Sequence, residues 1–299
     1  MSDFTVQQLH ERLARRPLLF DGGMGTQLIP AGLEPAACGV AWNLDRADTV
    51  EAIHRRYFDA GADIITTNTF QAGREALQMH ELSDKVIDLN RAGAEVARRA
   101  VGDAGLVAAD IGPFGGFLEP LGTTTPQELA ELFGEQLRAM KEGGADLVVV
   151  ETMSDTAEVT VAIKTARELG DWPIVSTYAF QMAGNDFVTM MGTDGASAIQ
   201  SSIAAGADVV GANCGTSMDL DDYVRLAGQL VEAAGDVPVI VQPNAGSPEQ
   251  TDDGLHYPAT PDQMAEVARR LIDAGAKVLG GCCGTTPEHI AAMARVVRG

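Results

Sequence analysis

Positive charge is scarce in this sequence of 299 residues: 21 Lys and Arg stand against 42 Asp and Glu, which leaves a net charge of −21. Nucleic acids and anionic lipid surfaces attract proteins through Lys and Arg, so this composition argues against both kinds of partner. The sequence also lacks an apolar run of the roughly 20 residues that a membrane-spanning helix needs. Its N-terminal segment, MSDFTVQQLHERLARRP, has no apolar centre of the kind found in signal peptides. We therefore expect a cytoplasmic protein.

Cysteine is rare too, with only four residues: Cys38, Cys214, Cys282 and Cys283. Four are too few for a disulfide scaffold of this size, and two adjacent cysteines in a cytoplasmic protein indicate metal binding or thiol chemistry. What the sequence does have is a globular composition, with 45% hydrophobic residues. Its length allows two domains or one α/β barrel.

One phrase recurs four times along the chain. The copies are AGADIITTN (60–68), GGADLVVVE (143–151), AGADVVGAN (205–213) and AGAKVLGGC (274–282). Each follows an amphipathic helical segment, and its glycine suits the left-handed residue that ends a helix. The apolar run after the glycine alternates too little for a sheet with one wet face, so it predicts a parallel strand that is buried on both faces.

Four further segments have the same strand character: 17–21, 105–113, 173–180 and 237–244. With the four repeats they make eight strands that alternate with helices without a break in the pattern. This cadence favours a (β/α)8 TIM barrel over a doubly wound sheet. No linker divides the chain, so we expect residues 1–299 to form one domain.

Enzymes with this fold carry their sites at the C-terminal ends of the strands. Polar residues occupy almost all of these ends: Asp21, Asn68, Thr69, Asp110, Glu151, Asn213, Cys214, Asn244, Cys282 and Cys283. The strands that end at Cys214 and at the Cys282–Cys283 pair lie two apart in a ring of eight. Three thiolates there predict a zinc site whose fourth position stays open. Cys38 lies outside any strand end, and we expect it to be inert.

Three thiolates outweigh the charge of one zinc ion, which makes the ion a poor activator of water and a good partner for a fourth sulfur. A coordinated thiol loses its proton near neutral pH and stays nucleophilic. The pattern therefore predicts alkylation of a substrate thiol. Two other classes stay open: a non-catalytic zinc protein that senses thiols, and a barrel enzyme that uses a different metal for hydrolysis.

Five motifs resemble those of the homocysteine S-methyltransferase family: DGGMGTQL (21–28), GADIITTNTF (61–70), GANCGTSMD (211–219), QPNAG (242–246) and GGCCGTTPEHI (280–290). They occur in the family's order over nearly the whole chain. TNTF (67–70), ETMSD (151–155) and GTDG (192–195) are most similar to the N-terminal homocysteine-binding module of cobalamin-dependent methionine synthase. The resemblance implies a methyltransferase of class EC 2.1.1 in methionine biosynthesis.

The resemblance also implies the roles of individual residues. Zinc would lie on Cys214, Cys282 and Cys283, with the homocysteine sulfur as its fourth ligand. The substrate ammonium group would meet Asp21 and Glu151, and the carboxylate would meet backbone N–H groups near Gly22. We further expect Asn68 and Thr69 to shape the pocket or bind the carboxylate. Asn244 would either fill the open zinc position before the thiol arrives or hydrogen-bond the turn after its strand.

The implied reaction is an in-line displacement in which the zinc-bound thiolate takes a methyl group and gives methionine, with no further catalytic residue. The methyl donor stays open. One possibility is methylcobalamin carried by a separate corrinoid protein, since this chain ends about ten residues after the last motif and we expect no corrinoid module within it. The other is a small donor such as S-methylmethionine or betaine. A betaine would need an aromatic cage, and only 5% of the residues are aromatic. Selenocysteine or a short mercaptan stays open as an alternative acceptor.

Overall fold

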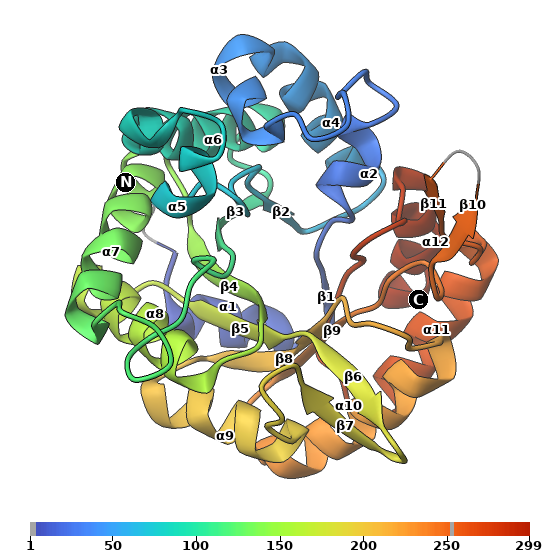
Figure 1. Ribbon diagram of the computed structural model, residues 1–299. Coiled ribbons are helices and arrows are strands. Elements are labelled where there is room, and N and C mark those ends of the chain that lie inside the picture. Colours follow the sequence, from blue (N-terminus) through green and yellow to red (C-terminus); the bar gives the residue numbers. More distant parts are fainter. Residues whose placement is uncertain (1–3, 252–253) are drawn as a thin grey trace.

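The computed structural model describes residues 4–251 and 254–299, so the first three residues of the N-terminal segment considered above lie outside it. Eight parallel strands form a ring in the order β1-β12-β9-β8-β5-β4-β3-β2 (Figure 1). They are β1 (Leu18–Leu19), β2 (Ile64–Thr66), β3 (Leu106–Ile111), β4 (Leu147–Met153), β5 (Ile174–Tyr178), β8 (Val209–Asn213), β9 (Val239–Gln242) and β12 (Val278–Leu279). A parallel bridge between Phe20 and Ile64 joins β1 to β2. All eight predicted strands and the (β/α)8 barrel are confirmed.

Helices surround the ring, and three of them begin with a threonine cap followed by proline, at Thr125, Thr260 and Thr286. The helices are α1 (Val6–Leu13), α2 (Met24–Leu28), α3 (Trp42–Asp45), α4 (Ala47–Asp59), α5 (Arg74–Gln78), α6 (Val86–Val101), α7 (Pro126–Glu142), α8 (Thr156–Leu169), α9 (Gly195–Ala205), α10 (Leu220–Ala234), α11 (Pro261–Asp273) and α12 (Pro287–Arg298), with short 3-10 turns η1 (Gly39–Ala41) and η2 (Ser83–Lys85). No helix within the described ranges is both long and apolar enough to cross a membrane.

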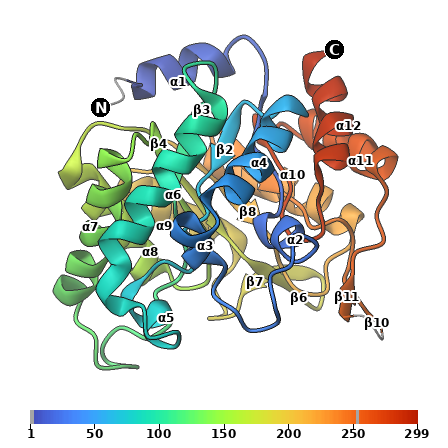
Figure 2. The same cartoon turned by 90° about the horizontal axis from the view of Figure 1, so that it is seen from above.

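Helix α1 closes one end of the barrel. Its Leu9 and Leu13 pack with Leu18, Phe20 and the inward-facing side chains of the other strands in one buried cluster. Figure 2 shows α1 on the opposite side of the molecule from two small hairpins. The interior is therefore a packed core that is covered at the amino end of the strands, and the carboxyl end carries the loops.

The two hairpins at the carboxyl end were not predicted. They are formed by β6 (Phe180–Ala183) with β7 (Asp186–Thr189), and by β10 (Glu249–Thr251) with β11 (Gly254–His256). The expected single strand over 173–180 is wrong at its end, because β5 stops at Tyr178 and Phe180 already belongs to β6. The tight turn between β6 and β7 contains Gly184 at a φ of 67°, a conformation that glycine adopts without strain.

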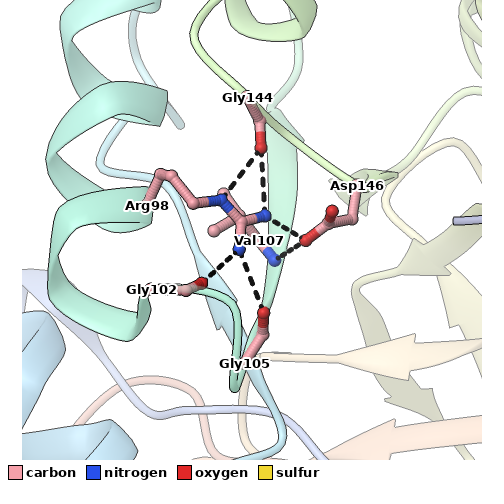
Figure 3. Close-up of polar contacts among 6 residues, drawn as sticks. All are labelled: Arg98, Gly102, Gly105, Val107, Gly144 and Asp146. Atoms are coloured by element: carbon pink, nitrogen blue, oxygen red, sulfur yellow. Dashed lines mark hydrogen bonds and ion pairs between the residues drawn. The ribbon is translucent and has the colours of Figure 1, made fainter. Parts of the chain in front are cut away.

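The aspartate of the recurring phrase has a structural role at the amino ends of the strands. Figure 3 shows the clearest copy, in which the Asp146 carboxylate accepts the Val107 N–H at 2.7 Å and pairs with Arg98. The Arg98 guanidinium also donates to three carbonyl oxygens, those of Gly102, Gly105 and Gly144. One ion pair thus joins helix α6 to the beginnings of β3 and β4.

Two other copies repeat this arrangement, which we call the Arg–Asp clasp. Asp63 accepts the Leu19 N–H at 3.0 Å and pairs with Arg16, and Asp208 accepts the Ile174 N–H at 2.8 Å and pairs with Arg167. The fourth copy has Lys277 in place of the aspartate. The glycines of all four copies have positive φ, between 96° and 110°, in agreement with the predicted helix ends.

Candidate active site

Three cysteine sulfurs meet at the carboxyl end of the barrel, where Cys214 follows β8 and the Cys282–Cys283 pair follows β12. All three sulfurs lie within 4.8 Å of one another, and the Cys214 and Cys283 sulfurs are 4.0 Å apart. Ligands at about 2.3 Å in a tetrahedron around zinc are about 3.8 Å apart. The three thiols therefore fit one ion of this size, and the expected convergence of two strand ends is confirmed. Cys38 lies elsewhere and packs beside a separate apolar cluster.

Backbone hydrogen bonds hold the cysteine-bearing turns together. The Cys214 N–H donates to the Gln242 carbonyl at 3.2 Å, and the Cys282 N–H donates to the Pro243 carbonyl at 2.9 Å. The turn after β12 also packs too closely for a side chain at Gly284, where a Cβ atom would lie 2.2 Å from Tyr257. The sulfur positions are therefore set by three adjacent strand ends.

The charge on the three thiols is shared. Hydrogen bonds from Cys214 and Cys282 lower the pKa of the Cys283 thiol, and the same kind of contact raises the pKa of Cys282. Contact among the sulfurs thus favours the thiolate form at Cys283 and the thiol form at Cys282. A cation placed among them would stabilise that charge.

Three acidic side chains at neighbouring strand ends interact with one another: Asp21 after β1 and Asp110 in β3 are buried, and Glu151 in β4 is partly buried and also interacts with Cys283. Removal from water raises the pKa of Asp21 to about 8 and that of Glu151 to about 7, and it holds the pKa of Asp110 well above its usual range. Repulsion from Glu151 raises the pKa of Asp21 and of Asp110 further, and the charge of Cys283 does the same for Glu151, whereas the hydrogen bond with Asp110 lowers the pKa of Glu151. Of the ion pairs within the described ranges, none gives these carboxyls a Lys or Arg partner. Among the described residues, this acidic cluster therefore has no cationic side chain to balance it.

The individual carboxyls are held differently. Asp21 accepts the N–H and the hydroxyl of Thr66, at 3.0 and 2.9 Å. Asp110 has a buried Oδ1 atom without a hydrogen-bond partner, although it contacts Glu151. The sequence identified Asp110 as a polar residue at a strand end and gave it no specific role. Its position beside Glu151 makes it part of the acidic cluster.

Asn213, the last residue of β8, was assigned no role from the sequence. In the structure its side chain forms hydrogen bonds with Glu151, Thr152 and Thr177. Its Nδ2 atom donates to Glu151 Oε2 at 2.9 Å and to Thr152 Oγ1 at 2.7 Å, and it lies 3.9 Å from the Cys282 sulfur. Its Oδ1 atom accepts from the Thr152 N–H and the Thr177 hydroxyl, both at 2.8 Å. Its one signal in the sequence is that it directly precedes Cys214.

The glycine turn after β1 has a free donor. Gly23 donates its N–H to Thr285 Oγ1 at 3.0 Å, whereas the Gly22 N–H has no acceptor within the described part of the chain. A Cβ atom at Gly22 would lie 2.6 Å from Thr285 Oγ1 and 2.9 Å from Tyr57. Gly22 is therefore needed for close packing, and its role in binding a carboxylate stays a prediction.

Asn68 and Thr69 are buried with their polar groups engaged. The Asn68 Nδ2 donates to the Gly39 carbonyl and to Asn43 Oδ1, at 3.0 and 2.9 Å. The Thr69 hydroxyl donates to the Asp110 carbonyl at 2.9 Å and lies 3.3 Å from the Met140 sulfur in α7. These bonds fix the loop after β2. A substrate contact for either residue stays a prediction.

Asn244 links two turns of the site. Its Nδ2 donates to the Gly215 carbonyl at 3.2 Å, and its Oδ1 accepts the Cys283 N–H at 3.1 Å. These bonds go to the turns after β8 and β12, not to the turn after its own strand, and a role at the open zinc position stays a prediction. His289 caps α12 together with Thr286.

The expected fold and the expected position of the thiols define a class of protein: a (β/α)8 barrel with a three-cysteine site and buried carboxyls at its carboxyl end. The sequence matches the family described as homocysteine S-methyltransferase over residues 18–297. The chain therefore belongs to the homocysteine S-methyltransferase family, whose members are methyltransferases.

Similar proteins agree with this assignment. The chain is 34% identical over 97% of its length to a methionine synthase of Mycobacterium leprae and 33% identical over 95% to one of Mycobacterium tuberculosis. It spans about a quarter of the length of these relatives. Among solved structures, the metallated form of the homocysteine methyltransferase MmuM from Escherichia coli has the same fold, with a TM-score of 0.78 at 22% identity over 97% of this chain and 99% of that one.

Proposed function

We propose that this protein is a zinc-dependent S-methyltransferase that transfers a methyl group to homocysteine and gives methionine. The proposal rests on two neighbouring groups of side chains: three thiols within 4.8 Å of one another, and the carboxyls of Asp21, Asp110 and Glu151, which form no ion pair with a Lys or Arg among the described residues. A thiol group matches the first set and an ammonium group matches the second. Homocysteine carries both, and the family to which the chain belongs supports the choice.

Each part of the site has a separate task in this proposal. Cys214, Cys282 and Cys283 would hold zinc, which when bound removes the proton of the substrate thiol and leaves the sulfur nucleophilic. Asp21 and Glu151 bind the ammonium group of the acceptor. The Gly22 N–H donates to no acceptor among the described residues and is therefore available to donate to the carboxylate. The chain thereby fixes the acceptor at both ends, so that its sulfur is oriented for in-line attack.

For the methyl donor we propose a corrinoid carried by a separate protein or domain. The supporting facts are the identity of 34% with methionine synthase and the shared TNTF, ETMSD and GTDG motifs. The aromatic residues that might form a cage for betaine are poorly placed: Trp42, Phe114, Tyr178 and Phe180 are at most 8% exposed, and Phe117 is 52% exposed. The donor experiment described below also includes S-methylmethionine, a small sulfonium donor.

Metal analysis tests the first half of the proposal. We expect about one zinc per chain, lost in Cys282→Ser and kept in the matched control Cys38→Ser, whose cysteine lies away from the site. Full methyltransfer by metal-free protein would contradict a zinc-dependent mechanism.

A donor panel tests the second half. Purified protein is incubated with homocysteine and, separately, methylcobalamin, a methylated corrinoid protein, S-methylmethionine or betaine, and methionine is measured. We expect methionine with the corrinoid donors. Tight thiol binding without turnover on any donor would instead support the thiol-sensing class.

A further inference from the structure

Glu151 lies at an irregular point of its strand. The pairing of β4 with β5 shifts register between Val150 and Met153, so Glu151 and Thr152 form a bulge. Thr152 has a φ of 60°, in the left-handed region that a β-branched residue rarely adopts. Bulges near active sites redirect a side chain and need support from their surroundings.

Asn213 supplies that support from the neighbouring part of the rim. It accepts the N–H of Thr152, donates to the hydroxyl of the same residue and donates to Glu151 Oε2, all between 2.7 and 2.9 Å. Its side chain is fully engaged and the residue is 1% exposed. One amide group thus fixes both residues of the bulge.

The same amide lies next to the sulfurs. Its Nδ2 atom is 3.9 Å from the Cys282 sulfur, and the following residue is Cys214. The side-chain amide of Asn213 contacts the Glu151 carboxylate, and its backbone continues directly into Cys214. The distance between that carboxylate and the thiols therefore depends on Asn213.

We propose that Asn213 is a positioning residue that sets the spacing between the ammonium-binding carboxylate and the thiols, and so selects acceptors that carry an amine at the right distance from sulfur. This inference rests on the proposed function, since it assigns the ammonium group to Glu151. Asn213 acts through Glu151 and the bulge, with no direct contact to the reacting atoms.

The test compares two acceptors that differ only in the amine. Homocysteine has the ammonium group, and 4-mercaptobutyrate has the same chain without it. Their dissociation constants are measured by calorimetry on the zinc-loaded protein, together with the zinc content. Binding is the main readout, so the result does not depend on knowing the methyl donor.

Two variants change the Asn213 contacts selectively. Asn213→Asp keeps the acceptor for the Thr152 N–H and places an oxygen against Glu151 Oε2, which turns Glu151 away from the pocket. Thr177→Val removes another hydrogen bond to the same Oδ1 atom, from β5, and leaves the Glu151 contact intact. Thermal unfolding confirms that each variant is folded, and Asn213→Ser replaces Asn213→Asp if the latter does not fold.

We expect Asn213→Asp to weaken homocysteine binding at least tenfold and to change 4-mercaptobutyrate binding less than twofold, with one zinc per chain retained. We expect Thr177→Val to keep the wild-type preference for homocysteine over 4-mercaptobutyrate. Equal losses for both acceptors, loss of zinc, or an unchanged preference would overturn the inference, as would a wild type that does not prefer homocysteine. A wild type that prefers homocysteine but transfers no methyl group would refute the proposed function and leave this inference standing.

Discussion

At the scale of single residues, the carboxyl end of the barrel brings together groups whose bonding is incomplete. The three thiols shift one another's pKa values, and the buried Asp21 and Asp110 and the partly buried Glu151 have no cationic partner among the residues the structure describes. Burying a carboxyl group without a cation costs free energy of folding. Nearby polar residues such as Asn68 and Asn213 have their hydrogen bonds satisfied. Asp110 Oδ1 is one of the buried polar atoms without a hydrogen-bond partner in the described part of the chain, and it lies next to the carboxyl of Glu151, to which we assign the ammonium group of the acceptor.

Asp21→Asn separates this functional role from its effect on stability. The amide can still bond to Thr66, but it loses the charge that attracts an ammonium group, so we expect homocysteine to bind about tenfold more weakly, or about 1.4 kcal/mol. Calorimetry of both proteins measures this loss, and unchanged affinity would remove Asp21 from the ammonium site.

The same substitution should increase stability at high pH. The pKa of Asp21 is raised to about 8 in the folded protein, so the folded state binds this proton more tightly than the unfolded state. The resulting stability is present below the unfolded pKa and is lost as pH rises through about 8. Asp21→Asn has no such loss. Thermal unfolding at pH 6 and pH 9 should show a higher melting temperature for the variant only at pH 9.

Several site residues could be predicted because their position follows from the repeat alone. Cys214, Cys282 and Cys283 directly follow recognisable strands, and parallel strands place their carboxyl ends on one rim. Asn213 could not be assigned a role in the same way, since its contacts depend on the bulge at Thr152. A bulge changes which way a side chain points and leaves no periodic signal in the sequence.

At the scale of elements, the Arg–Asp clasps and the cysteine turns divide the barrel into two ends with different tasks. Each clasp joins a helix or loop to the beginnings of two strands at the amino end, as Figure 3 shows for Arg98 and Asp146. The repeat was visible in the sequence, and its glycines and strands were predicted correctly. The role of its aspartate was not predicted, because the partner arginines lie between 41 and 48 residues away in the sequence and meet the aspartates only in the folded barrel.

Asp146→Asn should destabilise the protein without affecting the site. The amide oxygen can still accept the Val107 N–H, but the ion pair is lost and the Arg98 charge is left partly buried. We expect a loss of about 2–3 kcal/mol in the free energy of unfolding, measured by urea denaturation. The control is Glu266→Gln, which breaks the exposed pair with Arg269 and should cost under about 0.5 kcal/mol. Equal effects of the two variants, or weaker homocysteine binding by Asp146→Asn, would contradict a purely structural clasp.

The hairpins at the carboxyl end show where sequence reasoning failed at this scale. Tyr178 and Phe180 continue one apolar run, so the run alone does not reveal that the barrel strand ends and an antiparallel strand begins between them. The change depends on the loop that follows, with its turn at Gly184. Loops at this end vary the surroundings of the site while the ring of strands stays the same.

At the scale of the whole molecule, the net charge of −21 and the buried carboxyls both favour stability at lower pH. They respond differently to salt. Repulsion among exposed charges is screened within about 10 Å at 0.1 M salt and within less at higher concentrations. A buried carboxyl is screened much less. Glu158 in α8 is such a group: it is 5% exposed, and its Oε1 atom accepts the Phe114 N–H at 2.7 Å.

Stability measured against pH in high salt should therefore isolate the buried carboxyls. Burial raises the pKa of Glu158 from 4.5 to about 7, so its contribution is present below the unfolded pKa and is lost as pH rises through 7. The shift corresponds to about 3 kcal/mol. Glu158→Gln keeps an acceptor for Phe114 and does not titrate. Urea denaturation in 0.5 M salt should show that the free energy of unfolding of the wild type falls between pH 5 and pH 8.5. We expect this fall to be smaller by about this amount in Glu158→Gln and to equal the wild-type fall in the exposed control Glu266→Gln. Identical pH profiles for the wild type and Glu158→Gln would mean that Glu158 ionises at the same pH in the folded and the unfolded protein.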